Sequence, residues 1–212
     1  MNKHIALIYI ASSAIIDYIS KHPIDWADHH LAKLGQPGDK RTPAPAIALF
    51  FELFASRRAL FSQAEYVAYA EKQWRDWFDS LSLLEYRGAR ARLGCNFYVS
   101  AIDSLHVWAM LVETGQFSSC VIDTALDVVD KTDIIVINRE GEVISISLAI
   151  SSRAGREAYT YKETHRGVAQ NTVMMWLPID RPKSPGNKRW YRVEDIAAVV
   201  ERASEYLIGE RL

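Results

Sequence analysis

The chain has 212 residues, of which 49% are hydrophobic and 24% charged, and its formal net charge is −1. This composition is typical of a globular protein with room for one domain and appendages, or for two small domains. A charge so close to zero excludes a global basic field that attracts nucleic acid, so any such contact must come from local patches. Cys95 and Cys120 show no metal-ligand spacing, which favours buried thiols in a cytoplasmic protein over a disulfide framework.

The first apolar run covers residues 5–16. A membrane-spanning helix needs about 20 apolar residues, and the charged segment that follows this run argues against a secretory signal peptide. We therefore expect a buried core element here, and no membrane partner.

Two helices are expected in the next part of the chain. Residues 35–45 contain three prolines and two glycines and are expected to form a loop. Apolar residues at three-to-four spacing predict a helix over 46–58. Ser62 and Glu65 form a capping box, which begins another helix running to about Asp79. Two helices joined by a short turn also occur in DNA-binding helix-turn-helix units, but the aromatic content of the second helix favours core packing.

A second interruption is expected at residues 85–98, which bring several arginines close together. Ser100 is expected to cap a helix over 101–113, and Gly115 to end it in the left-handed conformation.

A β region follows. The pattern predicts a first strand, possibly with a break, over 121–129, then strands over 133–138 and 143–150. The last two are joined by a hairpin turn in which Gly141 takes a positive φ. The remaining expected elements are a charged helix over 153–166, a strand buried on both faces over 173–177, and a C-terminal helix from about 193 to 210.

These elements predict an α/β fold with a central mixed sheet of four or more strands flanked by helices. We expect residues 1–95 to form a mainly helical N-terminal region and residues 96–212 to form the α/β domain.

The order helix, three strands, helix, strand over about residues 97–180 resembles the restriction-endonuclease-like, or PD-(D/E)XK, superfamily. In that superfamily an acid in the first helix, an aspartate on the second strand and an acid-x-lysine pair on the third strand hold Mg²⁺ and polarise the attacking water. The resemblance implies that Asp103 is the helix acid and Asp133 the strand aspartate. The third-strand pair falls on Ser147 and Ala149, neither of which can do that chemistry.

Mg²⁺ is commonly held by one or two carboxylates with waters and phosphate. The resemblance therefore allows an active site in which Asp133 and Asp103 bind Mg²⁺ and Lys162 replaces the missing lysine. Asp130 is a less favoured second ligand. For His106, three residues after Asp103, we favour a hydrogen bond at the edge of the core over a role as general base.

Basic residues form three clusters in the sequence. If these share a face, they neutralise several phosphates and make binding sensitive to salt; a solvated face balanced by nearby glutamates explains them equally well. The candidate nucleic-acid-binding residues are Arg87, Arg90, Arg92, Arg153, Arg156, Lys188 and Arg189.

Three functional hypotheses follow. The first is a nucleic-acid-associated protein on a degenerate nuclease-like scaffold, with DNA favoured over RNA and with protein partners in a larger assembly. The second is an active Mg²⁺-dependent endonuclease with a relocated lysine. The third is a protein-interaction module without nucleic acid, which suits the near-zero charge and the 11% aromatic content.

Overall fold

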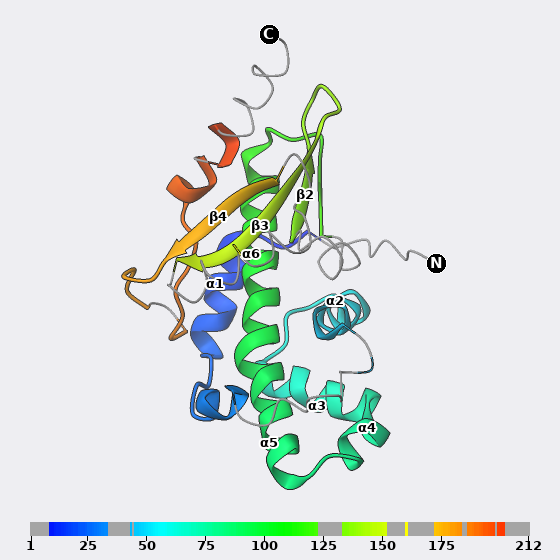
Figure 1. Cartoon of the computed structure of the whole chain (residues 1–212). Coiled ribbons are helices and arrows are strands. Elements are labelled where there is room, and N and C mark those ends of the chain that lie inside the picture. Colours follow the sequence, from blue (N-terminus) through cyan, green and yellow to red (C-terminus); the bar gives the residue numbers. More distant parts are fainter. Residues whose placement is uncertain are drawn as a thin grey trace.

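The structure is a computed structural model. It describes residues 9–33, 43, 45–122, 133–151, 160, 172–183, 186–197 and 199–201. Helices and a four-stranded mixed sheet make up this part of the chain (Figure 1), so the α/β class is confirmed. The helices are α1 (Ser12–Lys21), η1 (His29–Lys33), α2 (Ala46–Arg57), α3 (Gln63–Gln73), α4 (Arg75–Asp79), α5 (Leu83–Arg92), η2 (Leu93–Tyr98) and α6 (Val99–Thr114). Residues 193–197 and 199–201, where a C-terminal helix was expected, are helical as well. The strands are β1 (Ser119–Val121), β2 (Ile134–Ile137), β3 (Val143–Ser151) and β4 (Thr172–Pro178).

The two helices expected from residue 46 onward are present. α2 begins directly after Pro45, and α3 begins at the expected capping box, in which Ser62 and Glu65 bond each other's backbone N–H groups. The second helix does not run unbroken to Asp79, because the backbone leaves the helical conformation at Trp74 (φ −116°, ψ 33°) before α4 begins.

The interruption expected at residues 85–98 is wrong. α5, η2 and α6 follow one another without a break, with η2 as a turn of π-helix, so Ser100 lies inside a helix and caps nothing. Gly94 permits a close approach rather than a break: a Cβ there would lie 2.7 Å from Nε2 of Gln63. The end of α6 is as expected, since Gly115 is left-handed at φ 63°.

The sheet has the order β1-β2-β3-β4. β1, β2 and β3 are antiparallel neighbours, and β4 lies parallel to β3. The hairpin between β2 and β3 is confirmed: Oδ1 of the buried Asn138 accepts the N–H groups of Glu140 and Glu142, and Gly141 has φ 87°. β4 alternates buried and half-buried residues, so it is not buried on both faces as expected.

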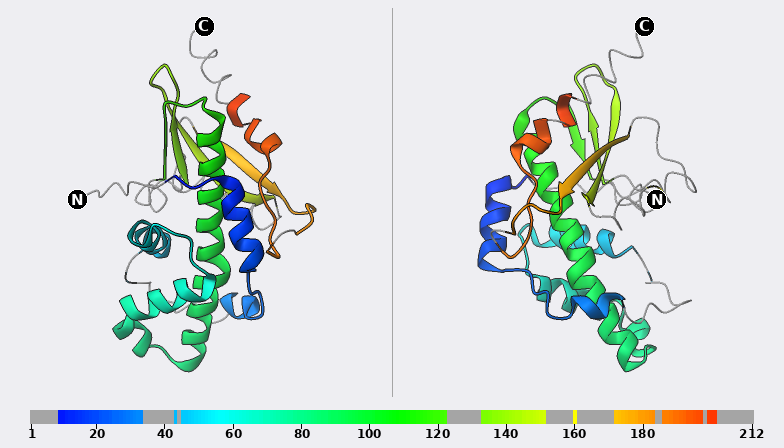
Figure 2. Two further views of the ribbon diagram at one scale, coloured as in Figure 1. Left: turned by 180° about the vertical axis from the view of Figure 1, so that it is seen from behind. Right: turned by 60° about the vertical axis from the view of Figure 1, so that its left-hand side comes forward.

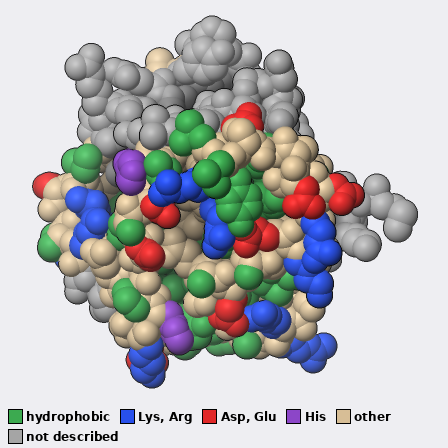
Figure 3. Space-filling model, turned by 90° about the horizontal axis from the view of Figure 1, so that it is seen from below, with side chains coloured by type: hydrophobic (Ala, Val, Ile, Leu, Met, Phe, Trp, Pro, Cys, Tyr) green, Lys and Arg blue, Asp and Glu red, His purple; other side chains and the backbone are tan. Residues whose placement is uncertain are grey.

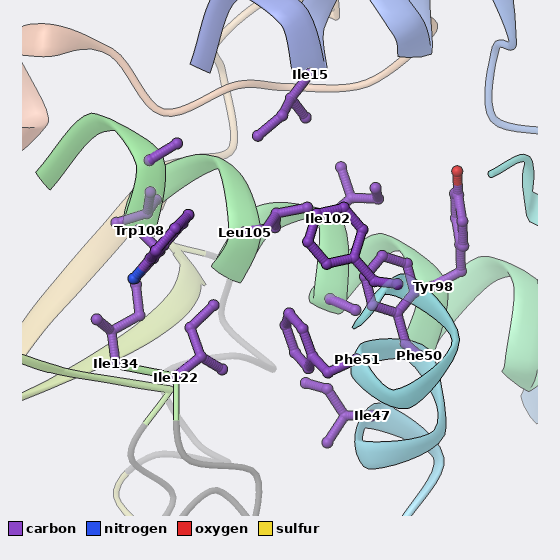
Figure 4. Packing of buried hydrophobic residues seen from close by; sticks show 14 of the residues in the cluster. Ile15, Ile47, Phe50, Phe51, Tyr98, Ile102, Leu105, Trp108, Ile122 and Ile134 are labelled. Carbon is purple, nitrogen blue, oxygen red and sulfur yellow. The ribbon is translucent and has the colours of Figure 1, made fainter. Parts of the chain in front are cut away.

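The core is one cluster that lies along α6. Figures 1 and 2 show α6 crossing one face of the sheet, with α1 and α2 on opposite sides of the helix. In Figure 4, Trp108 packs toward Ile134 of the sheet, while Leu105 lies between the helices that carry Ile15 and Phe51. Because this cluster contains residues from both sides of position 95, the expected two-region division stays a prediction.

In the part of the chain that the structure describes, no helix combines the length and the apolar character needed to cross a membrane.

Candidate functional site

The carboxylate of Asp103 forms an ion pair with Lys188. Asp103 lies on α6, and its Oδ1 accepts a hydrogen bond from Nζ of Lys188, which belongs to the segment before residue 193. The side chains are 13% and 2% exposed, so the pair is buried. Burial raises the pKa of Asp103, and the charge of Lys188 opposes that rise.

The ring of Trp190 contacts both Lys188 and His106. The Trp190 ring centroid lies 4.8 Å from Nζ of Lys188, a cation–π contact, and 4.8 Å from the imidazole centroid of His106 in an edge-on arrangement. Burial and the charge of Lys188 lower the pKa of His106 to about 4, so the imidazole is neutral at pH 7. Asp103 bonds Lys188 and lies one helical turn from His106, and no bond between Asp103 and His106 is found among the described contacts.

Asp133 is held against β3. Its N–H donates to the carbonyl of Ile146 at 2.9 Å, and its Oδ2 accepts the N–H of Leu148 at 2.7 Å. The residue of β3 between those two is Ser147, which is buried. Asp133 therefore lies beside the strand position where the nuclease pattern has its second acid.

Tyr191 is subject to the negative charges of both acids. Its hydroxyl is 3.3 Å from the carbonyl of Ala149 on β3 and 3.5 Å from that of Met175 on β4. Burial raises the pKa of Tyr191, and the negative charges of Asp103 and Asp133 raise it further. Both acids thus act on one hydroxyl at the boundary of β3 and β4, although no carboxylate–carboxylate contact joins them in the described structure.

Among the described residues, the lysine that contacts Asp103 is Lys188. Lys162, Arg153, Arg156 and Asp130 lie outside the described residues. Lys188 was expected on a nucleic-acid-binding surface, yet it is buried on Asp103, 85 positions away in the sequence. No local pattern indicates a pairing over such a separation.

The other candidate arginines are spread out. Arg87 and Arg90 are exposed on α5, whereas Arg92 is half-buried, which lowers its pKa. Arg90 lies 3.4 Å from Glu71, and Nε of Arg189 donates to the carbonyl of Arg181. Figure 3, which views the α5 end, shows basic side chains scattered among acidic and hydrophobic ones rather than gathered in one patch.

The described residues contain no cluster of three or more His, Cys, Asp or Glu side chains able to hold a metal ion. The expected Mg²⁺ ligands, Asp133 and Asp103, each have a protein group on the carboxylate already. The arrangement can hold charge in a buried setting, but it presents no carboxylate pair pre-arranged for a cation.

Comparisons with known proteins give no match: no protein-family model, no curated protein and no solved structure is similar to this chain.

Proposed function

We propose that this chain is a nucleic-acid-associated protein on a PD-(D/E)XK nuclease-like scaffold whose active site is degenerate. It serves as a DNA-binding or structural subunit of a larger assembly. The observation that carries the proposal is the state of the two acids: Asp103 is neutralised by Lys188, and Asp133 is bonded to Leu148 beside the uncharged Ser147.

The support for the scaffold is the order and direction of the elements. A long helix, α6, precedes an antiparallel meander of β1, β2 and β3, and β4 returns parallel to β3. A parallel neighbour requires a crossover connection between the two strands. The charges of Asp103, which matches the helix acid of the nuclease pattern, and of Asp133, which matches its strand aspartate, both raise the pKa of Tyr191.

The support for degeneracy is chemical. A lysine charge placed beside the phosphate in a nuclease is worth about 10² to 10³ in rate, and Ala149 cannot supply it. A Mg²⁺ ion that binds Asp103 competes with the Lys188 ammonium for the same carboxylate. Because the lysine side chain is buried, its charge is then left without a counterion. The site therefore disfavours metal and catalysis while keeping the fold intact.

The proposal places the nucleic-acid contact on the exposed side of α5, where Arg90 also pairs with Glu71. Arg87 and Arg90 lie three residues apart on α5, so they project from the same side of the helix. With a net charge of −1, such a surface engages few phosphates, so we expect weak binding with a strong dependence on salt.

The test is a binding titration by fluorescence anisotropy, with a labelled DNA duplex and an RNA of the same sequence. The salt concentration is varied from about 50 to 200 mM, a range over which phosphate contacts lose much of their affinity. We expect Arg87→Gln to weaken binding and to reduce the salt slope by about one, the effect of one lost phosphate contact.

Arg139→Gln is the matched control. Arg139 is exposed in the β2–β3 hairpin, at the opposite end of the molecule from α5 in Figure 1. Absence of any binding to DNA or RNA at the lowest salt concentration would overturn the proposal and favour a protein-interaction module.

A second candidate function is an active nuclease in which the relocated lysine is Lys188. The observation that favours it is the contact between Nζ of Lys188 and Asp103. In that case metal-dependent cleavage is lost in both Asp133→Ala and Lys188→Met.

A further inference from the structure

A pocket of about 450 Å³ opens between α1, α6, Pro182 and residues 190–194. Its inner wall consists of four buried side chains: His106 and Met110 of α6, and Trp190 and Tyr191. Exposed Ser13 and Arg192 lie at its mouth. The volume falls within the range of about 300–1,000 Å³ typical of small-molecule sites.

The inner wall is aromatic and apolar apart from His106. This imidazole is neutral at pH 7, since its pKa is lowered to about 4. A neutral imidazole has one nitrogen that donates and one that accepts, and Nδ1 of His106 has no hydrogen-bond partner in the described structure. His106 thus places in this wall a buried nitrogen without a partner, which a heterocycle contacts only when the side chains that cover it shift.

We propose that this pocket binds a single nucleobase, either of a free nucleotide or of an unstacked residue in a strand. The inference rests on the proposed function and adds the chemical class that the site recognises. Flat heteroaromatic rings bind in pockets where aromatic and apolar side chains cover their faces and a few polar groups contact their edges. In this pocket the aromatic and apolar surface comes from Trp190, Tyr191 and Met110, and the polar group comes from His106.

The mouth of the pocket suits the rest of a nucleotide. The hydroxyl of Ser13 and the guanidinium of Arg192 are within the lining, where they can contact a ribose and a phosphate. Glu194 lines the same mouth, so the net charge there is close to zero. The base, rather than the phosphate, therefore supplies most of the affinity.

The test is isothermal titration calorimetry of the full chain with each of the four ribonucleoside 5′-monophosphates, with the nucleosides alone and with inorganic phosphate. We expect one or more of the nucleotides to bind, the corresponding nucleoside to retain binding, and phosphate alone to give no heat. Ser13→Trp places a large ring at the mouth and should weaken nucleotide binding at least about tenfold.

Ala14→Trp is the matched control, because Ala14 is the next exposed residue of α1 and does not line the pocket. His106→Phe keeps a ring but removes both nitrogens, so it should weaken nucleotide binding as well. Circular dichroism spectra of all variants show whether each is folded.

Three results would overturn the pocket assignment. These are no binding by any nucleotide, equal losses in Ser13→Trp and Ala14→Trp, and binding of N-acetyl-tryptophanamide as tight as that of the nucleotides, which assigns the pocket to a protein partner. If the DNA or RNA titration shows binding but the pocket experiments give one of these three results, the pocket inference is wrong and the proposed function stands. If nucleotides bind and the polymers do not, the proposed function falls and the pocket remains.

Discussion

Asp103 and Lys188 meet across 85 positions of sequence in a buried setting. Removing one member of such a pair leaves the other charged and without a counterion, which costs about 3–5 kcal/mol. We expect Lys188→Met to lower the free energy of unfolding by that amount in urea denaturation at pH 7. The double variant Asp103→Leu/Lys188→Met should recover much of the loss, since no charge remains buried.

The exposed pair Lys21–Asp17 is the control, because its side chains are 68% and 63% exposed. Asp17→Asn should change the free energy of unfolding by no more than about 1 kcal/mol. A similarly small effect of Lys188→Met would show that the buried pair does not form.

His106 makes the fold sensitive to acid. Its pKa is lowered from 6.5 to about 4 by burial and by Lys188, while Glu113 acts in the opposite direction. Because the folded pKa is depressed, protons bind the unfolded chain first, and stability is lost as the pH falls from 6.5 toward 4. We expect the protonation of His106 alone to lower the free energy of unfolding by about 3 kcal/mol between pH 7 and pH 4.

The measurement is the free energy of unfolding at both pH values for wild type, His106→Gln and the exposed-site control His22→Gln. The pH-dependent loss should shrink only in His106→Gln. Equal pH dependence in all three proteins would contradict the burial of a neutral imidazole.

At the scale of the element, the N-terminus of α3 shows which local signals a sequence carries. Glu65 accepts hydrogen bonds from the backbone and hydroxyl of Ser62 and one from Arg57, which together lower its pKa from 4.5 to about 2. This stabilisation is present above pH 4.5 and is lost as the pH falls toward 2.

We expect Glu65→Gln to lower the free energy of unfolding by about 0.3–1 kcal/mol at pH 7, because the group is largely exposed. The difference from wild type should vanish near pH 2. Glu52→Gln, at an exposed position in the middle of α2, is the control. A difference for Glu65→Gln that is the same at pH 7 and pH 2 would show that its charge has no role.

Elements with local signals were predicted, and those fixed by distant contacts were not. The capping box of α3, the left-handed Gly115 and the hairpin around Asn138 depend on residues within five positions of each other. The α5–η2–α6 run was missed: Gly94 does not break it, because Gln63, from a separate helix, packs against this glycine.

At the scale of the whole molecule, the sequence predicted the strands better than the site. Alternating and continuous apolar runs predicted three of the strands, and one side of the expected site, Asp133 beside Ser147, could be read from the strand pattern. The other side could not. The segment after β4 folds back so that Lys188 bonds Asp103 of α6. Three residues later, the hydroxyl of Tyr191 contacts the carbonyl of Ala149 on β3. Neither contact produces a periodic pattern in the sequence from which it could be predicted.

The central claim is that both carboxylates accept hydrogen bonds from within the protein, Asp103 from Lys188 and Asp133 from the N–H of Leu148. Its most direct test is incubation of supercoiled plasmid DNA with the wild-type chain and with Asp133→Ala, in the presence of Mg²⁺ or Mn²⁺, followed by electrophoresis. We expect both proteins to leave the plasmid supercoiled. Nicking or linearisation by the wild type that disappears in Asp133→Ala would contradict the account, because it would show that Asp133 serves a working metal site.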